Sequence, residues 1–173
     1  MVFPFRKLIT LILLAGCFTT TSHAQKKVAP HWFSQKLKSA DSVLMVSHHK
    51  TKGHMAVDSN GNLIPFQELM LGNQPNYAVI LERKLIKGSA VDSLIRILTR
   101  PAARGNYVLK GCFSPHHALF IFKGNKTSYL NLCFDCKREE SSDDLFKLPI
   151  FDPRRWEELK AFYVKQGFKY QLK

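Results

Sequence analysis

Short apolar segments separated by turn-forming residues run through this chain, and their lengths predict β-strands. The segments that fit are 42–48, 77–85, 107–111, 118–122 and 127–134. Near the end of the chain, Phe168, Tyr170 and Leu172 alternate with polar residues, which is compatible with one more strand. Residues 51–76 are rich in Gly, Asn and Pro, so we expect a long loop there with at most short elements.

Two longer segments have the period of amphipathic helices. The first opens at Ser89, in a sequence close to a capping box, and stops before Pro101. The second begins after Asp152 as N-cap with Pro153 in its first turn, and Gly167 closes it. Their apolar stripes comprise Val91, Leu94, Ile95 and Leu98 in the first helix, and Trp156, Leu159, Phe162 and Tyr163 in the second. We expect a short helix over 31–39 as well.

The clearest turn is Gly124-Asn125, a two-residue loop with glycine first that is typical of a type II′ β-hairpin. Its register predicts one face with Leu119, Ile121, Leu130 and Leu132, and another with Phe120, Phe122 and Tyr129. Because the strands follow one another directly, the pattern predicts an α+β fold. We expect a single domain with a mainly antiparallel sheet of about five strands and two principal helices.

Residues 1–24 have the features of a signal peptide. Arg6 and Lys7 form a basic start, and the apolar run 8–14 is too short to span a membrane. A small-x-small site ending at Ala24 predicts cleavage there. Leu-Ala-Gly before Cys17 resembles a bacterial lipobox, in which Cys17 would be lipidated, and this alternative to cleavage after Ala24 stays open.

Either processing route exports the chain, so we expect a periplasmic, outer-membrane-anchored or secreted protein. The domain would span 25–173, with 25–30 as a flexible tether and no membrane-spanning segment in the mature chain.

Basic residues outnumber acidic ones, with 26 Lys and Arg against 13 Asp and Glu. Loss of Arg6 and Lys7 with the signal peptide lowers the formal net charge from +13 to +11. Such a surface attracts polyanions, so acidic envelope polymers and lipid headgroups are candidate partners. The basic residues are scattered, however, and this favours solvated lysines over a dedicated site.

The chain concentrates reactive side chains near its C-terminal third: Cys112, His116, His117, Cys133 and Cys136. The last two form a CxxC motif. Counting outward from the two-residue turn, His116 faces Cys133, and Cys112 comes level with Cys136 to within one residue, although we expect Pro115 to end regular pairing before that. A slip of one residue would bring His117 opposite Cys133 instead. The register therefore predicts one site at the open end of the hairpin.

Several chemistries fit this site. Zinc is a candidate cofactor, held by three cysteines and one histidine. A disulfide, between Cys112 and either Cys136 or Cys133, suits an exported protein but leaves one thiol over. A redox-active CxxC pair is the third, although thioredoxin-like proteins place that motif at a helix N-terminus. Inert, buried cysteines are the remaining alternative.

A second group of histidines comprises His48, His49 and His54. It would reach the cysteines only if strand 42–48 neighboured the hairpin, which no local pattern establishes. We therefore expect a solvated loop cluster.

The run Cys112-Phe-Ser-Pro-His-His117 followed by Cys133-Phe-Asp-Cys136 resembles a family of uncharacterised exported bacterial proteins and lipoproteins with a CF-x-P-x-H … CF-x-C motif. The resemblance covers roughly residues 107–168 and implies that Cys112, Pro115, His117, Cys133 and Cys136 belong together. It implies no reaction.

These observations favour an exported cell-envelope protein of unknown biochemical role with a structural Cys/His cluster, and a protein that is not an enzyme. One alternative is a metal- or thiol-dependent enzyme that uses Cys112, His117, Cys133 and Cys136. A second is a basic polyanion-binding envelope protein.

Overall fold

A computed structural model describes residues 31–51, 56–103, 105, 111–145, 148 and 151–172. The predicted signal peptide, Cys17, the tether 25–30 and His54 lie outside the described residues. The predicted strand 107–111 lies outside them as well, apart from Gly111.

One antiparallel sheet of five strands organises the described chain, in the order β6-β1-β7-β8-β9. Its strands are β1 (Ser42–His48), β6 (Ile80–Ile86), β7 (His117–Lys123), β8 (Lys126–Cys133) and β9 (Arg138–Ser141). With helices packed on it, this sheet confirms the predicted single-domain α+β arrangement.

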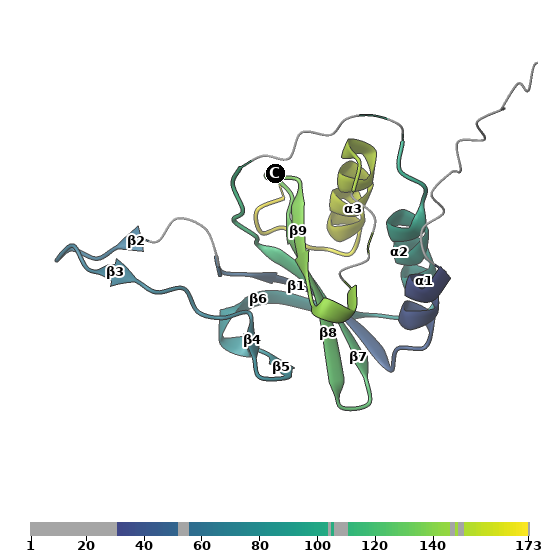
Figure 1. Ribbon diagram of the computed structural model, residues 1–173, viewed down its shortest axis with the longest axis horizontal. Coiled ribbons are helices and arrows are strands. Elements are labelled where there is room, and N and C mark those ends of the chain that lie inside the picture. The colour runs from purple at the N-terminus through teal and green to yellow at the C-terminus, as the bar shows by residue number, and fades with distance from the viewer. Residues whose placement is uncertain are drawn as a thin grey trace, which may run out of the picture.

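The long loop before β6 has only short elements in its described residues, 51 and 56–79, as its composition predicts. Two small hairpins lie there, β2 (Ala56–Val57) with β3 (Leu63–Ile64), and β4 (Met70–Leu71) with β5 (Gln74–Pro75). The β2–β3 hairpin extends away from the sheet at the left of Figure 1. A 3₁₀ turn, η1 (Tyr77–Val79), follows, so the predicted strand 77–85 starts three residues late, at Ile80.

Three helices cover one face of the sheet: α1 (His31–Lys38), α2 (Ser89–Thr99) and α3 (Pro153–Lys165). Their buried stripes join the main core, which includes Leu37, Leu98 and Trp156 together with Met45 and Leu119 from the sheet. A second 3₁₀ turn, η2 (Asp143–Leu145), follows β9. Within the described ranges, no helix is long and apolar enough to cross a membrane.

The opposite face of the sheet carries a smaller core. There Val46 and Phe120 pack beneath Leu69 and Val79, which belong to the long loop and to η1. This loop is therefore what buries the second face, since all three helices lie on the first.

The β7–β8 hairpin has the predicted register. Lys123 pairs with Lys126 around the Gly124-Asn125 turn, and Gly124 has a φ of 56°. Asn125 is not among the described residues with positive φ, as a type II′ turn requires. The two predicted faces are confirmed, because the leucines and Ile121 belong to the main core whereas the aromatic residues pack with the smaller one.

The predicted helix ends agree at α3 and differ at α2. Asp152 accepts a hydrogen bond from the backbone N–H of Arg155, and this confirms it as the N-cap of α3. The prediction for α2 was wrong by one residue: Gly88, at φ 53°, is the N-cap, and Ser89 is already helical. No side chain caps this end, because glycine supplies the conformation but no acceptor.

The prediction of a last strand over 168–172 was also wrong. This segment runs as turns across the end of the sheet, and the fifth strand is β9, in a polar stretch that showed no strand pattern. A side chain, and not a partner strand, provides hydrogen bonds to the backbone of this segment: the Glu82 carboxylate accepts from the backbone N–H groups of Lys169 and Tyr170.

Candidate functional site

The open end of the β7–β8 hairpin brings the three predicted cysteines together. Cys133 ends β8, and Cys136 lies in the turn that leads to β9. The two are joined by a disulfide with a Cα–Cα distance of 5.2 Å. The backbone N–H of Cys136 also donates to Sγ of Cys133 over 3.2 Å. Lys137, at φ 52°, then turns the chain into β9.

Cys112 is the thiol left over. Its Sγ lies 2.9 Å from Sγ of Cys136, which agrees with the hairpin register, since that register brings the two residues level to within one residue. Cys112 is exposed, whereas both disulfide cysteines are 2% exposed. The predicted pairing was therefore wrong: the bond joins Cys133 to Cys136, because the tight turn after β8 brings these two together.

Arg138 holds the segment around Cys112 in place. It is the first residue of β9 and pairs directly with Cys133. Its guanidinium donates to the carbonyl oxygen of Cys112 over 3.4 Å and lies over the ring of Phe113 at 5.6 Å. Arg138 of β9 thus links the segment that precedes β7, at Cys112 and Phe113, to the end of β8, at Cys133.

The two neighbouring histidines point to opposite faces of the sheet. His117 pairs with Leu132 in the ladder, so the next residue outward, His116, is level with Cys133 and shares its face. The backbone N–H of His116 donates to the carbonyl of Leu132 over 3.3 Å, which continues the same register. His116 is therefore the histidine on the cysteine side of the sheet, whereas the family resemblance pointed to His117.

His117 is built into the helix-covered face. Its Nε2 lies 2.9 Å from the carbonyl oxygen of Tyr170, and its ring meets those of Phe134 and Tyr163 edge-on. Burial lowers the pKa of His117 to about 4, although the Tyr170 carbonyl acts in the opposite direction. A neutral, packed imidazole in this position ties the C-terminal segment to the sheet.

His48 belongs to the cysteine side of the sheet and not to a solvated loop. Strand β1 lies beside β7, and the N–H of His48 donates to the carbonyl of His116 over 2.9 Å. Its side chain is buried, with Nδ1 2.7 Å from the His49 carbonyl and Nε2 3.1 Å from Oδ1 of Asn131. Burial lowers the pKa of His48, so the ring is neutral at physiological pH.

His116 completes this polar group between the sheet and the long loop. Burial lowers its pKa also, and its Nδ1 is buried without a hydrogen-bond partner among the residues described. Sequence reasoning missed Asn131 and Glu82, since each contacts a histidine or backbone group from a strand remote in sequence. Asn131 has one local signal, a polar residue between two leucines of an apolar strand, whereas Glu82 has none, because Arg83 and Lys84 follow it.

The zinc site stays a prediction, and it applies only to the protein with its disulfide reduced. In the disulfide, Cys133 and Cys136 are not thiolates, and thiolate is the form of cysteine that binds zinc. In the described ranges, no group of three His, Cys, Asp or Glu side chains is placed to hold a metal ion.

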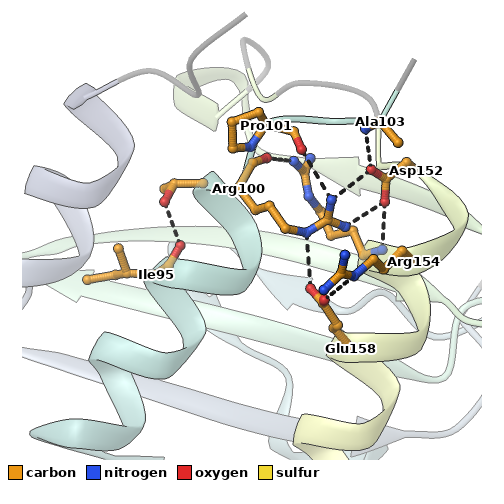
Figure 2. Close-up of polar contacts among 9 residues, drawn as sticks. Ile95, Arg100, Pro101, Ala103, Asp152, Arg154 and Glu158 are labelled. Atoms are coloured by element: carbon orange, nitrogen blue, oxygen red, sulfur yellow. Dashed lines mark hydrogen bonds and ion pairs between the residues drawn. The ribbon is translucent and has the colours of Figure 1, made fainter. Parts of the chain in front are cut away.

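A second polar cluster joins the C-terminus of α2 to the N-terminus of α3 (Figure 2). Arg100 binds both carboxylate oxygens of the buried Asp152, at 3.0 and 2.7 Å, and donates to Glu158 over 3.1 Å. Ala103 N–H donates to the same carboxylate over 2.7 Å. Burial alone would raise the pKa of Asp152, but these hydrogen bonds hold it well below its usual value.

Comparison with protein families, with curated proteins and with solved structures finds no match to this chain. The family resemblance of the cysteine motif therefore stays a prediction, and function is argued from the sites alone.

Proposed function

We propose that the chain is an exported cell-envelope protein, a small domain of binding or structural role whose Cys/His cluster is structural. The observation that carries this proposal is the Cys133–Cys136 disulfide, buried at the junction of β8 and β9. Disulfides persist in oxidising compartments, which agrees with the export signal predicted from residues 1–24.

The disulfide stabilises the open end of the hairpin, where regular pairing stops. It spans a sequence separation of only 3, so the chain-entropy model gives a contribution of about 2 kcal/mol. Two hydrogen bonds from side chains also hold this end together: Arg138 bonds to the carbonyl of Cys112, and His117 bonds to the carbonyl of Tyr170. The cluster is therefore a set of cross-links between segments that share no ladder.

The test is to purify the exported protein without reductant and to measure free thiols, metal content and thermal unfolding. We expect one titratable thiol, no stoichiometric metal and a melting temperature that falls when reductant is added. Three unreactive cysteines with one zinc ion per chain would contradict the disulfide and support the zinc alternative.

A second candidate function, polyanion binding, is supported by a groove between α2 and α3. The groove has a volume of about 830 Å³, and its basic lining residues are Arg96, Arg100, Arg154 and Lys165. Glu158 is the one acidic residue among the described residues that line it, and it is already bound to Arg100 and Arg154 (Figure 2). Arg96 and Lys165 form no ion pair with a described residue, so their charges are available to an anion.

This candidate is tested by the binding of a sulfated polysaccharide at several salt concentrations. The double variant Arg96→Ala/Lys165→Ala should bind more weakly, and binding of the wild type should weaken steeply with salt. A matched control, Lys87→Ala/Lys126→Ala, removes the same charge from exposed sites outside the groove. Equal loss in both variants would contradict a dedicated site.

A further inference from the structure

An exposed thiol touches a buried disulfide at the open end of the hairpin. Thiol–disulfide exchange requires a thiolate to reach one sulfur of a disulfide, and Sγ of Cys112 lies 2.9 Å from Sγ of Cys136. The other two cysteines are 2% exposed, so a thiol from solution has no comparable access to them. Cys112 is the one sulfur of the three that faces both solvent and the disulfide.

We infer that Cys112 exchanges with the Cys133–Cys136 disulfide and passes its oxidising equivalents to dithiols outside the protein. This inference rests on the disulfide of the proposed function, and it gives the leftover thiol an activity. The substrate class is a protein or peptide with two neighbouring cysteine thiols.

The first step is an isomerisation within the site. The Cys112 thiolate attacks Sγ of Cys136, the Cys112–Cys136 bond forms, and the Cys133–Cys136 bond breaks. The electron pair leaves on Sγ of Cys133, which takes up one proton to replace the proton that Cys112 has lost. No oxidant or reductant is consumed, because one disulfide replaces another.

One contact favours Cys133 as the leaving group, while its burial acts in the opposite direction. The backbone N–H of Cys136 donates to Sγ of Cys133, and a hydrogen bond to sulfur favours its thiolate form. Arg138 binds the carbonyl of Cys112 and is also the ladder partner of Cys133. It therefore holds the attacking residue, Cys112, close to the end of β8, where the leaving group Cys133 lies. Arg138 is a positioning residue in this step.

The second step transfers the bond to the partner. A partner thiolate attacks the exposed sulfur of Cys112, forming a mixed disulfide and releasing Cys136 as a thiolate. The second partner thiol then displaces Cys112, so that the partner gains one disulfide and the protein is left with three thiols. Two electrons pass from the partner to the protein, and the Cys133–Cys136 disulfide is the oxidant.

The experiment has two stages, both on the exported, mature chain purified without reductant. First, thiols are alkylated in acid and disulfides are mapped by mass spectrometry. Second, the protein is mixed with a peptide that carries two cysteines, and oxidation of the peptide is followed. The wild type should oxidise one peptide per chain, and Cys112→Ser should do so slower by a factor of about ten or more while keeping its disulfide and its melting temperature.

A second variant, Cys133→Ser, checks the intermediate. It should form a Cys112–Cys136 disulfide under a mild oxidant, and the peptide should be captured at Cys112. Three free thiols in the first stage would overturn the proposed function and this inference together. A mapped Cys133–Cys136 disulfide with peptide oxidation equal in wild type and Cys112→Ser, or absent from both, would overturn the exchange alone.

Discussion

The two ends of the β7–β8 hairpin are ordered by different means. At the closed end, Gly124 and Asn125 reverse the chain, and the N–H of Gly124 donates to Asp41 over 2.6 Å. At the open end, a disulfide, the packed ring of His117 and the bond from Arg138 hold segments that do not pair as strands. Local backbone preference thus sets the chain reversal at the closed end, and Asp41 adds one contact from a remote segment. The open end has no such turn, and its order depends on the disulfide and on contacts of His117 and Arg138 with segments outside the hairpin.

The two ends should differ most in how much free energy of unfolding is lost when an aromatic residue is replaced by alanine. Phe134 is buried at the open end and contacts the rings of His117, Trp156 and Tyr163. We expect Phe134→Ala to lower the free energy of unfolding by about 3–5 kcal/mol, because it leaves a cavity in the main core. The matched change near the closed end, Phe122→Ala, removes a half-buried ring and should cost clearly less. Urea unfolding of both variants measures the difference, and equal losses would contradict the contrast.

Acid should weaken the open end through His117. Its folded pKa, about 4, lies below the ordinary value of 6.5, so the unfolded chain takes up its proton first as the pH falls. The stabilisation is complete above pH 6.5 and is lost between pH 6.5 and 4, by roughly 3 kcal/mol. His48 and His116 act in the same direction, because burial lowers the pKa of both.

His117→Gln should flatten the dependence of unfolding free energy on pH between 7.5 and 4, without removing it. A profile identical to that of the wild type would show that His117 is not the main titrating group.

Loss of the disulfide should have an intermediate effect. Cys133→Ser/Cys136→Ser should lower the free energy of unfolding by about 2 kcal/mol, since the bond closes a short loop. Cys112→Ser is the control, and as a change at an exposed residue it should stay within about 0.5 kcal/mol of the wild type. If Cys112→Ser costs as much as the double variant, all three sulfurs act as one structural unit and the assignment of the bond is wrong.

The smallest effect is expected at the closed end. Gly124→Ala forces an alanine to a φ of 56°, which should cost about 1–2 kcal/mol. A Cβ there would meet nothing within 4 Å, so the cost is one of backbone conformation alone. Gly111→Ala, also in open space but without a left-handed φ, should be nearly neutral in the same thermal melts. A neutral Gly124→Ala would mean that the turn tolerates another conformation.

The two ends of the hairpin also differ in how well the sequence predicts them. The Gly124-Asn125 turn, the alternation of Leu119 and Ile121, and the cap at Asp152 depend on near neighbours, so local patterns sufficed. The turn count also placed Cys112 level with Cys136 to within one residue, and their sulfurs lie 2.9 Å apart. It could not decide which two of three adjacent sulfurs are bonded, because all three pairings fit the same register.

Contacts between remote segments were beyond local patterns. His117 meets the carbonyl of Tyr170 across 53 residues, and His48 meets Asn131 across 83. Strand β9 forms because β8 offers it an edge, although its own residues are polar. The predicted strand over 168–172 fails for the reverse reason, since Glu82 satisfies its backbone in place of a partner strand.

At the open end, Cys133 and Cys136 are bonded, and Cys112 is the exposed thiol beside them. The most direct test of this arrangement is to alkylate the exported protein in acid without reductant and to sequence its peptides by mass spectrometry. The structure predicts a linked Cys133–Cys136 pair and a label chiefly on Cys112. A protein labelled on all three cysteines, or one in which Cys112 is chiefly bonded and Cys133 labelled, would contradict it.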